Sequence, residues 1–438
     1  MRTLSLLSIL SAVTAASVQA IFFNEDPTTQ SLLDQLYGEL VHDESSLYRR
    51  RQLLSQGIKS EPDIFSIESH HQQSLNAYLS MRPEIDFPNK DDVSDIQMDQ
   101  NMFGGILTYA HLPHFNCFNP EYFKSDQDEY KIDIAIVGAP FDTGVSFRPG
   151  ARFGPEAIRR NARRLGGGTR HKKYNNKKVP IDPYDSCTHN YSIVDCGDVG
   201  MTPFDNRIAL NQLYRGQRAV HKHIGNINKI PKIITMGGDH TIALMTLKSI
   251  SEQLGKPVKI VHFDSHIDTW DPKVLGGGIT DYMSLNHGTF LHYAHELGYI
   301  EPKGNYHVGI RAPYVDSVYD PQHDSDCGFH IIKASDIDKV GVRGIIDTLK
   351  TELGTTDPVY ISVDIDVLDP AFAPGTGTME VGGFTGRELL SILDGLNGIN
   401  LVGADVVEVS PPYDTNSEIT SLAATSVIDS FLKLMIAK

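Results

Sequence analysis

Three segments of this 438-residue sequence gather Asp and His residues directly after short apolar runs. Residues 237–241 read Gly-Gly-Asp-His-Thr, residues 264–268 read Asp-Ser-His-Ile-Asp, and residues 364–370 read Asp-Ile-Asp-Val-Leu-Asp-Pro. In an open α/β sheet, ligands bind beyond the carboxyl ends of the strands. If the apolar runs are such strands, the sequence predicts that these polar side chains meet at one edge of the sheet.

The spacing within these segments predicts a metal centre. In an extended chain, residues i, i+2 and i+4 point the same way. Asp264, His266 and Asp268 are therefore expected to share one side of the chain, and so are Asp364 and Asp366. Four clustered carboxylates repel one another and resist ionisation unless cations offset their charge.

The number and type of these groups indicate which metal they bind. With His240 they make six ligands, which are too many for one tetrahedral zinc ion but suit two ions bridged by shared carboxylates. Carboxylate-rich ligation without thiolates favours Mn²⁺. The neighbouring Asp239 is interpreted as a loop or helix-capping residue rather than a ligand.

The elements that must position these groups follow an α/β pattern. Helical patterns lie between several apolar runs, and two helix starts are marked, one by Pro155 and one by the capping box of Thr385 and Glu388. Buried strands that alternate with amphipathic helices indicate a parallel sheet covered on both faces. The expected strands are residues 132–137, 230–236, 258–263, 306–310, 359–363 and 401–409.

Composition excludes some classes of partner. Asp and Glu total 55 against 39 Lys and Arg, a formal net charge of −16. This balance argues against nucleic acid or an anionic membrane as the main partner. Hydrophobic residues make up 40% of the chain, which is enough for a substantial core.

The first 100 residues are predicted to lie outside the catalytic domain. Residues 1–20 have the charged, apolar and small-residue order of a secretory signal, with cleavage after Ala20. The mature protein is therefore expected to be secreted and soluble, with no membrane segment. Residues 21–100 are predicted to form a polar extension and residues 101–438 the catalytic domain, in which residues 166–191 form a surface insertion.

Four cysteines could pair in an oxidising compartment, with three possible connectivities. No Cys-x-x-Cys is present, so a thiolate zinc site is not expected. The second and third cysteines are close enough in sequence to close a loop, and the sequon at Asn190 in the same stretch would suit a glycosylated loop. The cysteines are Cys117, Cys187, Cys196 and Cys327.

The three segments resemble the signatures of the ureohydrolase family, which includes arginases, agmatinases and guanidino-acid ureohydrolases. The third signature is long, because residues 362–370 are followed at 374–383 by Pro-Gly-Thr-Gly-Thr-Met-Glu-Val-Gly-Gly. The resemblance covers about residues 102–438. It implies an arginase-like, three-layer α/β domain with a central, mainly parallel eight-stranded sheet and two Mn²⁺ ions per chain.

The resemblance also implies a ligand set, in which Asp264 and Asp364 bridge the two ions. Water held by the ions forms hydroxide, which attacks the guanidinium carbon to give urea and an amine. The implied ligands are His240, Asp264, Asp268 and Asp364 for one ion, and His266, Asp264, Asp364 and Asp366 for the other.

Three residues are assigned catalytic roles. Asp268 orients the hydroxide, and Glu408 binds the guanidinium through paired hydrogen bonds. His287 passes a proton to the leaving amine, since imidazole titrates in the required range. Glu408 and His287 are thus also the predicted substrate contacts.

The substrate is predicted from two stretches. Residues 276–285 lack the Ser-Gly-Asn element with which arginases hold the amino-acid head group, and residues 141–155 resemble agmatinases and guanidinobutyrases. Agmatine, cleaved to putrescine and urea, is the predicted substrate. Guanidinobutyrate or another guanidino acid is the alternative.

Two other functions compete with this one. Deacetylase relatives use one metal ion, and the presence of both His240 and Asp366 argues against them. A secreted, inactive metal-binding relative would have lost a ligand, His287 or Glu408, and all are present. By family analogy, the protein is expected to form a homotrimer or hexamer.

Overall fold

The structure, a computed structural model, describes residues 106–123, 127, 130–165, 182–185, 189–275 and 284–437. The predicted signal (1–20), the extension (21–100) and most of the insertion (166–191) lie outside these residues. So do residues 276–283, on which part of the substrate prediction rests.

Within the described residues, eight strands form one sheet in which all neighbouring strands are parallel. The predicted fold class is confirmed. From one edge to the other the strands are β2 (Ile193–Asp198), β1 (Ile134–Ala139), β3 (Lys232–Gly237), β8 (Asn400–Val407), β7 (Pro358–Asp364), β4 (Lys259–Phe263), β5 (Asn305–Ile310) and β6 (Phe329–Lys333).

The sequence missed β2 and β6, which are the two edge strands. β2 ends in polar residues, and β6 alternates between buried and exposed positions, so neither has the continuous apolar run of a strand covered on both faces. The six predicted strands all exist, with ends that differ by at most two residues.

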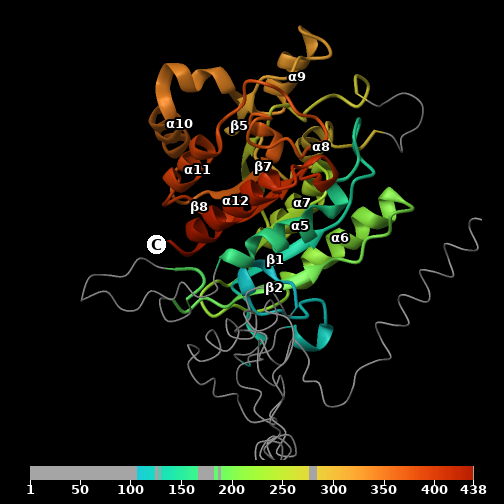
Figure 1. The fold of residues 1–438 in the computed structure, drawn as a ribbon, viewed down its shortest axis with the longest axis vertical. Coiled ribbons are helices and arrows are strands. Elements are labelled where there is room, and N and C mark those ends of the chain that lie inside the picture. Colours follow the sequence, from blue (N-terminus) through green and yellow to red (C-terminus); the bar gives the residue numbers. More distant parts are fainter. Residues whose placement is uncertain are drawn as a thin grey trace, which may run out of the picture. The chain divides into compact units, whose positions relative to one another are not determined.

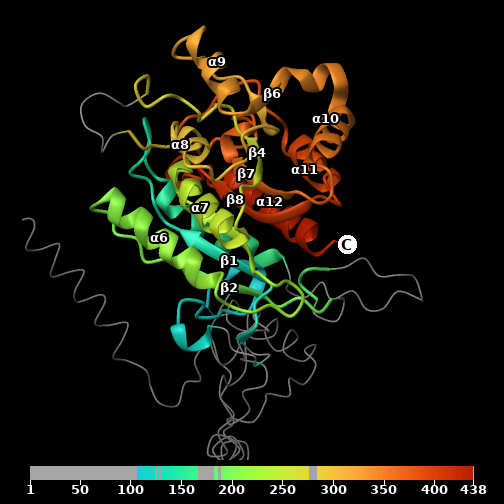
Figure 2. The same ribbon diagram turned by 180° about the vertical axis from the view of Figure 1, so that it is seen from behind.

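Helices cover both faces of the sheet, and Figures 1 and 2 show the two layers from opposite sides. On one side α12 packs against β8, α5 and α11, and on the other α7 packs between α6 and α8. The helices of the first layer are α5 (Gly154–Asn161), α10 (Ile337–Leu353), α11 (Gly386–Gly395) and α12 (Ile419–Ile436), and the others are α6 (Asn206–Val220), α7 (Ala243–Leu254), α8 (Phe290–Glu296) and α9 (Tyr319–Asp326).

Both predicted helix starts are confirmed. Pro155 lies in the first turn of α5, where its missing N–H costs no hydrogen bond. The Thr385 hydroxyl accepts a hydrogen bond from the Glu388 N–H, and the Glu388 carboxylate accepts one from the Thr385 N–H. This capping box begins α11.

Among the described residues, α12 is long and apolar enough to cross a membrane by length and composition alone. However, 67% of its 18 residues are buried inside the protein. Its apolar surface packs on the sheet and on α5 and α11, which is typical of a core helix.

A disulfide joins Cys117 to Cys196, 79 residues apart, at the β2 edge of the fold. The suggested pairing of Cys187 with Cys196 is therefore wrong, because Cys196 already has a partner that approaches it through the fold. Cys187 lies outside the described residues, and Cys327 is free and buried.

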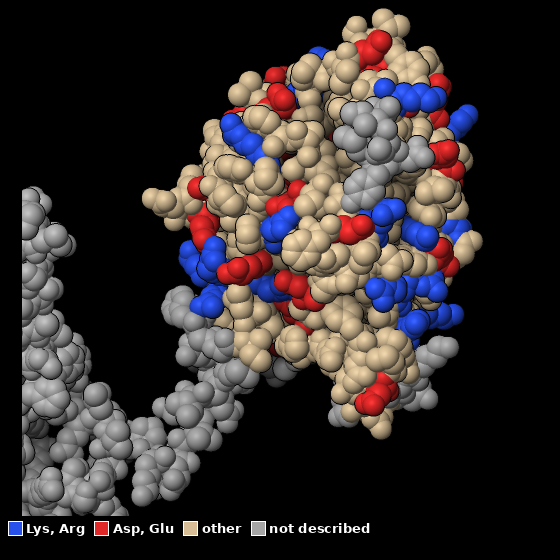
Figure 3. Space-filling view, turned by 90° about the vertical axis from the view of Figure 1, so that its right-hand side faces the viewer, with Lys and Arg blue, Asp and Glu red and all other residues tan. Residues whose placement is uncertain are grey.

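The surface in Figure 3 carries both signs of charge. Lys and Arg side chains lie among Asp and Glu side chains over much of this face, and several Lys and Arg side chains gather at its lower right. The acidic excess of the sequence is therefore not gathered on this face.

The ion pair between α5 and β2 leads to a stability prediction. Arg159 is buried, and its Nε and Nη2 donate to the two carboxylate oxygens of Asp195 at 2.8 and 3.0 Å. Arg159→Met leaves this buried carboxylate without its guanidinium partner. We expect the free energy of unfolding to fall by about 3–5 kcal/mol, measured by urea denaturation.

The control is Arg160→Met on the same helix. Arg160 pairs with Glu156 and Glu418 near the surface, so its loss should cost about 1 kcal/mol or less. Equal losses of stability in the Arg159 and Arg160 variants would contradict the importance of the buried pair.

Candidate metal and substrate site

The candidate site lies at the carboxyl ends of four neighbouring central strands, β3, β8, β7 and β4. His240, Glu408 and Asp264 follow β3, β8 and β4, and Asp364 is the last residue of β7. Because the strands are parallel, these ends meet at one edge of the sheet. The sheet thereby brings His240 and Glu408, which are 168 positions apart in sequence, into contact.

Gly238, directly after β3, allows the chain to approach a neighbouring segment closely as it enters the site. A Cβ at Gly238 would lie 1.9 Å from the carbonyl oxygen of Phe141, so the close approach of the two chains requires glycine. The Asp239 N–H donates to that same carbonyl oxygen at 2.7 Å. As predicted, Asp239 is a capping residue: its side chain accepts a hydrogen bond from the Thr241 N–H.

The segment after β4 reaches the site as a turn. Asp264 Oδ1 accepts a hydrogen bond from the His266 N–H at 2.6 Å, and Asp268 has a left-handed backbone with φ of 52°. The prediction that these side chains share one side of an extended chain is therefore wrong, because the chain turns here. The turn nevertheless brings them together, since His240 Nδ1 lies 3.1 Å from an oxygen of Asp264 and 3.1 Å from one of Asp268.

The segment after β7 also turns. Asp364 Oδ1 accepts a hydrogen bond from the Asp366 N–H, which places Asp366 on a short 3-10 helix rather than on an extended strand. Asp366 Oδ2 lies 3.1 Å from His266 Nδ1. The other oxygen accepts hydrogen bonds from the N–H and the hydroxyl of Ser265. Ser265, to which the sequence analysis gave no role, therefore orients Asp366.

The Nδ1 of His240 faces the carboxylates. The Ser362 hydroxyl donates its proton to Asp405 at 2.6 Å, so its oxygen accepts the Nε2–H of His240 at 2.7 Å. Burial lowers the pKa of His240, but the hydrogen bonds to Asp264 and Asp268 outweigh burial and raise it well above its usual value, so Nδ1 attracts a proton or a metal cation. Metal-binding histidines commonly donate their other N–H in this way, because a cation between the lone pair and the carboxylates removes their repulsion.

The structure adds His262, which the sequence analysis missed. His262 Nδ1 is hydrogen-bonded to His307 Nδ1 at 2.8 Å, and His307 Nε2 to Asp324 at 2.9 Å. If each bond donates toward Asp324, His262 Nε2 keeps a lone pair, 3.1 Å from Asp264. Burial lowers the pKa of His262 to about 3, which keeps the ring neutral. Its position two residues before Asp264, on the same face, was the available signal.

Two groups of potential ligand atoms share Asp264, and the atoms of each group lie within 4.8 Å of one another. The members are His240, His262, Asp264 and Asp268 in one group, and Asp264, His266 and Asp366 in the other. Asp364 adjoins the first group, with an oxygen 3.4 Å from His240 Nδ1. His240 Nδ1, His262 Nε2 and Asp264 Oδ2 are buried without a hydrogen-bond partner. Such oxygen and imidazole donors fit divalent metal ions.

Burial and mutual repulsion act on the carboxyl groups. Burial, followed by the charge of Asp264, raises the pKa of Asp268 to about 6. Burial, followed by the charges of Asp366 and Asp264, holds the pKa of Asp364 well above its usual range. Arg311, at the end of β5, directs its guanidinium to backbone carbonyl oxygens rather than to these carboxylates. The site therefore favours added cations.

Glu408 and His287 adjoin these donor groups. Glu408 is 1% exposed, and its Oε1 accepts a hydrogen bond from the His240 N–H and lies 3.1 Å from His287 Nδ1. Its Oε2 is buried without a partner. Burial lowers the pKa of His287, but the hydrogen bond to Glu408 and its charge outweigh burial and raise that pKa to about 8. On its other side, His287 Nε2 accepts a hydrogen bond from the Ser146 N–H at 3.0 Å and lies 2.8 Å from the Ser146 hydroxyl.

A cavity of about 190 Å³ is lined by His287 and by three of the potential metal ligands, and Glu408 lies behind His287 rather than in the lining. Its lining combines polar groups of the site with apolar side chains and one further carboxylate. Among the lining residues are Ser146, His266, Asp268, Trp270, Leu275, His287, Pro313, Val315, Asp364 and Glu380. All eight residues that the sequence singled out therefore lie in or beside one site.

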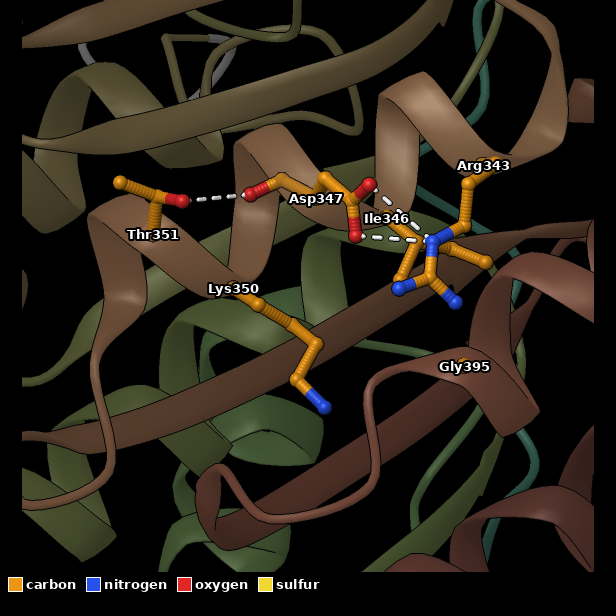
Figure 4. Close-up of a pocket in the computed structure, with 6 residues that line it drawn as sticks. All are labelled: Arg343, Ile346, Asp347, Lys350, Thr351 and Gly395. Carbon is orange, nitrogen blue, oxygen red and sulfur yellow. Dashed lines mark hydrogen bonds and ion pairs between the residues drawn. The ribbon is translucent and has the colours of Figure 1, made fainter.

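A second cavity, of about 320 Å³, lies between α10 and α11. In Figure 4 its Arg343 and Asp347 pair with each other, and Thr351 points back to the carbonyl oxygen of Asp347. Lys350 donates to the carbonyl oxygen of Asn397. Its polar groups are satisfied by their neighbours, and its lining offers no group for catalysis.

Comparison with known proteins identifies relatives. The model of the Arginase family matches residues 132–433. A Schizosaccharomyces pombe protein named "Putative agmatinase 1" is 43% identical over 349 residues, which are 77% of this chain and 84% of that protein. The proclavaminate amidinohydrolase of Streptomyces clavuligerus is 36% identical over 329 residues, 74% of this chain and 91% of that protein.

A solved structure agrees with these matches. The crystal structure of a hypothetical agmatinase from Burkholderia thailandensis aligns with a TM-score of 0.61 and 31% sequence identity. The alignment covers 76% of this chain and 91% of the other chain.

Metal removal is expected to destabilise the protein, because it leaves the clustered carboxylates unneutralised. Dialysis of Mn²⁺-loaded protein against EDTA should lower the melting temperature by about 5–10 °C, and added Mn²⁺ should restore it. The matched control is the double variant Asp268→Asn, Asp366→Asn, whose melting temperature should respond little to EDTA. A wild-type melting temperature that EDTA leaves unchanged would rule out a stabilising metal centre.

Proposed function

Because this chain belongs to the arginase family, hydrolases that act on guanidino carbon–nitrogen bonds, we propose that it cleaves agmatine to urea and putrescine. The observation that carries the proposal is the buried, unpartnered oxygen of Glu408 beside the metal-binding donor groups. Relatives named as agmatinases support this class of substrate.

We propose that two Mn²⁺ ions bind the site, through the sets His240, Asp264, Asp268, Asp364 and His266, Asp264, Asp364, Asp366. When bound, two such ions supply a water of lowered pKa as the nucleophile. The protein contributes orientation: Ser362 fixes the tautomer of His240, and Ser265 fixes the carboxylate of Asp366. Asp268 offers a carboxylate oxygen that can accept a hydrogen bond from the attacking water.

Glu408 is suited to hold the guanidinium. One oxygen is already fixed by the His240 N–H, so the side chain cannot rotate away, and the other is free. This free oxygen can accept a charge-assisted hydrogen bond from a guanidinium N–H. Because Glu408 contacts the loop that carries His240, it would place the guanidinium carbon beside the metal-binding groups.

His287 is suited to donate a proton to the leaving amine. Burial lowers its pKa, but Glu408 raises it to about 8, and the Nδ1–H faces Glu408 while Nε2 accepts a hydrogen bond from the Ser146 N–H. The imidazolium can give a proton to the amine as the carbon–nitrogen bond breaks. Ser146 then lies in position to pass a replacement proton from the solvent side.

The rest of the cavity fits the tail of agmatine. Trp270, Leu275 and Val315 line it with apolar surface, which suits a chain of methylene groups. Glu380 adds a carboxylate that is 36% exposed and lies 3.9 Å from His266 Nε2. A carboxylate here attracts the terminal ammonium of agmatine and repels the carboxylate of a guanidino acid.

We also propose that the protein is exported and forms homo-oligomers. The Cys117–Cys196 disulfide supports an oxidising compartment, where such bonds persist. Asn190 is exposed, as a glycosylated sequon must be. The culture medium of the source cells should then contain the cleaved protein, and light scattering should give the mass of a trimer or hexamer.

The function is tested by urea release from Mn²⁺-loaded protein with agmatine, arginine, guanidinobutyrate and guanidinopropionate. We expect the highest kcat/KM with agmatine. A higher value with a guanidino acid would move the assignment to that substrate. No urea from any of the four would support the inactive metal-binding relative instead.

Glu408→Gln should lower kcat/KM for agmatine about 10- to 100-fold. The variant keeps the shape of the side chain but removes the charge that pairs with the guanidinium, which is worth about 1.5–3 kcal/mol. Elemental analysis of the same sample should show unchanged Mn²⁺ content. If metal is lost in parallel with activity, Glu408 acts on the metal centre and not on the substrate.

Glu380→Gln should change substrate preference with little effect on the chemical step. For a partly exposed charge, we expect the KM for agmatine to rise up to about fivefold with kcat retained. The KM for guanidinobutyrate should fall or stay constant, because a repulsion is removed. A parallel rise in KM for both substrates would disprove a charge interaction between Glu380 and the tail.

A further inference from the structure

Two imidazoles and a thiol converge outside the catalytic site. His292 Nδ1 lies 3.0 Å from His323 Nε2, and Cys327 Sγ lies 3.8 Å from the same nitrogen. All three donor atoms lie within 4.8 Å of one another. His292 belongs to α8, and His323 to α9, which Cys327 follows directly. We propose that these three side chains bind a Zn²⁺ ion that joins α8 to α9.

The distances fit a tetrahedral ion. With Zn–N near 2.0–2.1 Å and Zn–S near 2.3 Å, tetrahedral ligands stand about 3.3 Å apart for two nitrogens and about 3.6 Å apart for nitrogen and sulfur. The observed separations of 3.0 and 3.8 Å differ from these values by a few tenths of an ångström. His323 and Cys327 are four residues apart, and the Cys327 N–H donates to the His323 carbonyl oxygen, so one helical turn presents both side chains together.

Neighbouring groups hold the two imidazoles in place. His292 Nε2 lies 3.5 Å from a carboxylate oxygen of Glu296, which favours a proton on Nε2 and leaves Nδ1 to face the site. The His323 ring stacks on Tyr319, with ring centroids 5.5 Å apart. The Tyr319 hydroxyl donates to Asp271 at 2.7 Å. Glu296 thus orients His292, and the Tyr319 ring orients His323.

The local charge favours a cation that binds thiolate. Burial, followed by the charges of Asp324, Asp326 and Asp271, raises the pKa of the Cys327 thiol to about 12. The same negative charges attract a divalent ion, and an ion bound to sulfur displaces the thiol proton. One thiolate with two imidazoles selects zinc over manganese, which prefers oxygen ligands. The His292 side chain is 19% exposed, so an ion and a fourth, water ligand can enter from solvent.

An ion here would stabilise residues 268–270 of the catalytic site, because both α8 and α9 contact them. On the α8 side, the Leu291 N–H donates to the carbonyl oxygen of Asp268. On the α9 side, Trp270 Nε1 donates to Asp320 at 2.9 Å, and the Thr269 hydroxyl donates to Asp324. Residues 268–270 are therefore hydrogen-bonded to both helices that the ion would join. The ion would have a structural role next to the catalytic site.

The test is a Co²⁺ titration of full-length, Mn²⁺-loaded protein in thiol-free buffer, followed by near-ultraviolet absorption. Sulfur-to-cobalt charge transfer requires a thiolate ligand, and the catalytic donor groups contain none. We expect a band that saturates at about one Co²⁺ per chain and that Zn²⁺ abolishes by displacement. The band should be lost in Cys327→Ser and retained in the matched control Cys187→Ser.

A second measurement covers the case in which Cys327→Ser does not fold. Anomalous diffraction at the zinc edge from wild-type crystals soaked in Zn²⁺ should give a peak about 2.3 Å from Cys327 Sγ. Absence of that peak, or a cobalt band that survives Cys327→Ser, would overturn the proposal and leave His292 and His323 as a hydrogen-bonded pair. Because neither readout requires urea release, failure of the zinc site and failure of the proposed activity remain distinguishable.

Discussion

Repulsion among four buried carboxylates is the constraint on which the rest of the site depends. Asp264, Asp268, Asp364 and Asp366 are all at most 5% exposed. Burial, followed by the charges of the neighbouring carboxylates, raises the pKa values of Asp268 and Asp364. Two imidazole nitrogens, His240 Nδ1 and His262 Nε2, face the same region. Cations between these groups would offset the repulsion.

The surrounding fold holds this unfavourable arrangement in place. The four carboxylates belong to the segments at the carboxyl ends of β4 and β7, which are neighbours in the sheet, so the fold keeps them close together. The chain from His240 through Ser362 to Asp405 fixes one imidazole, and the chain from His262 through His307 fixes the other. Glu408, linked to the same loop, adds a free carboxylate oxygen for a cationic substrate. The metal-binding groups and the substrate carboxylate therefore lie side by side, and both favour positively charged ligands.

The sequence predicted those features that depend on local pattern. Apolar runs covered on both faces marked the six inner strands, and Asp and His placed directly after them marked the site. The edge strands β2 and β6 lack that pattern, and so they were missed. The turns at Asp268 and Asp366 were missed because the spacing of polar residues is the same in a turn and in an extended strand.

Contacts between distant segments could not be predicted from local pattern. The Ser265 hydroxyl orients Asp366, which is 101 positions away in sequence. The Ser362 hydroxyl orients His240, which is 122 positions away. The disulfide partner of Cys196 lies 79 residues away rather than in the nearby loop. These contacts depend on the order of the strands in the sheet, which brings distant segments together. The sequence analysis did not derive that order.

The most direct test of this account is the manganese content of the catalytic site. The protein would be saturated with Mn²⁺, freed of excess ion by desalting, and analysed for metal per chain together with its urea release from agmatine. The account predicts two Mn²⁺ per chain and activity that rises with occupancy of both. Full activity with one ion per chain, or with none, would contradict it.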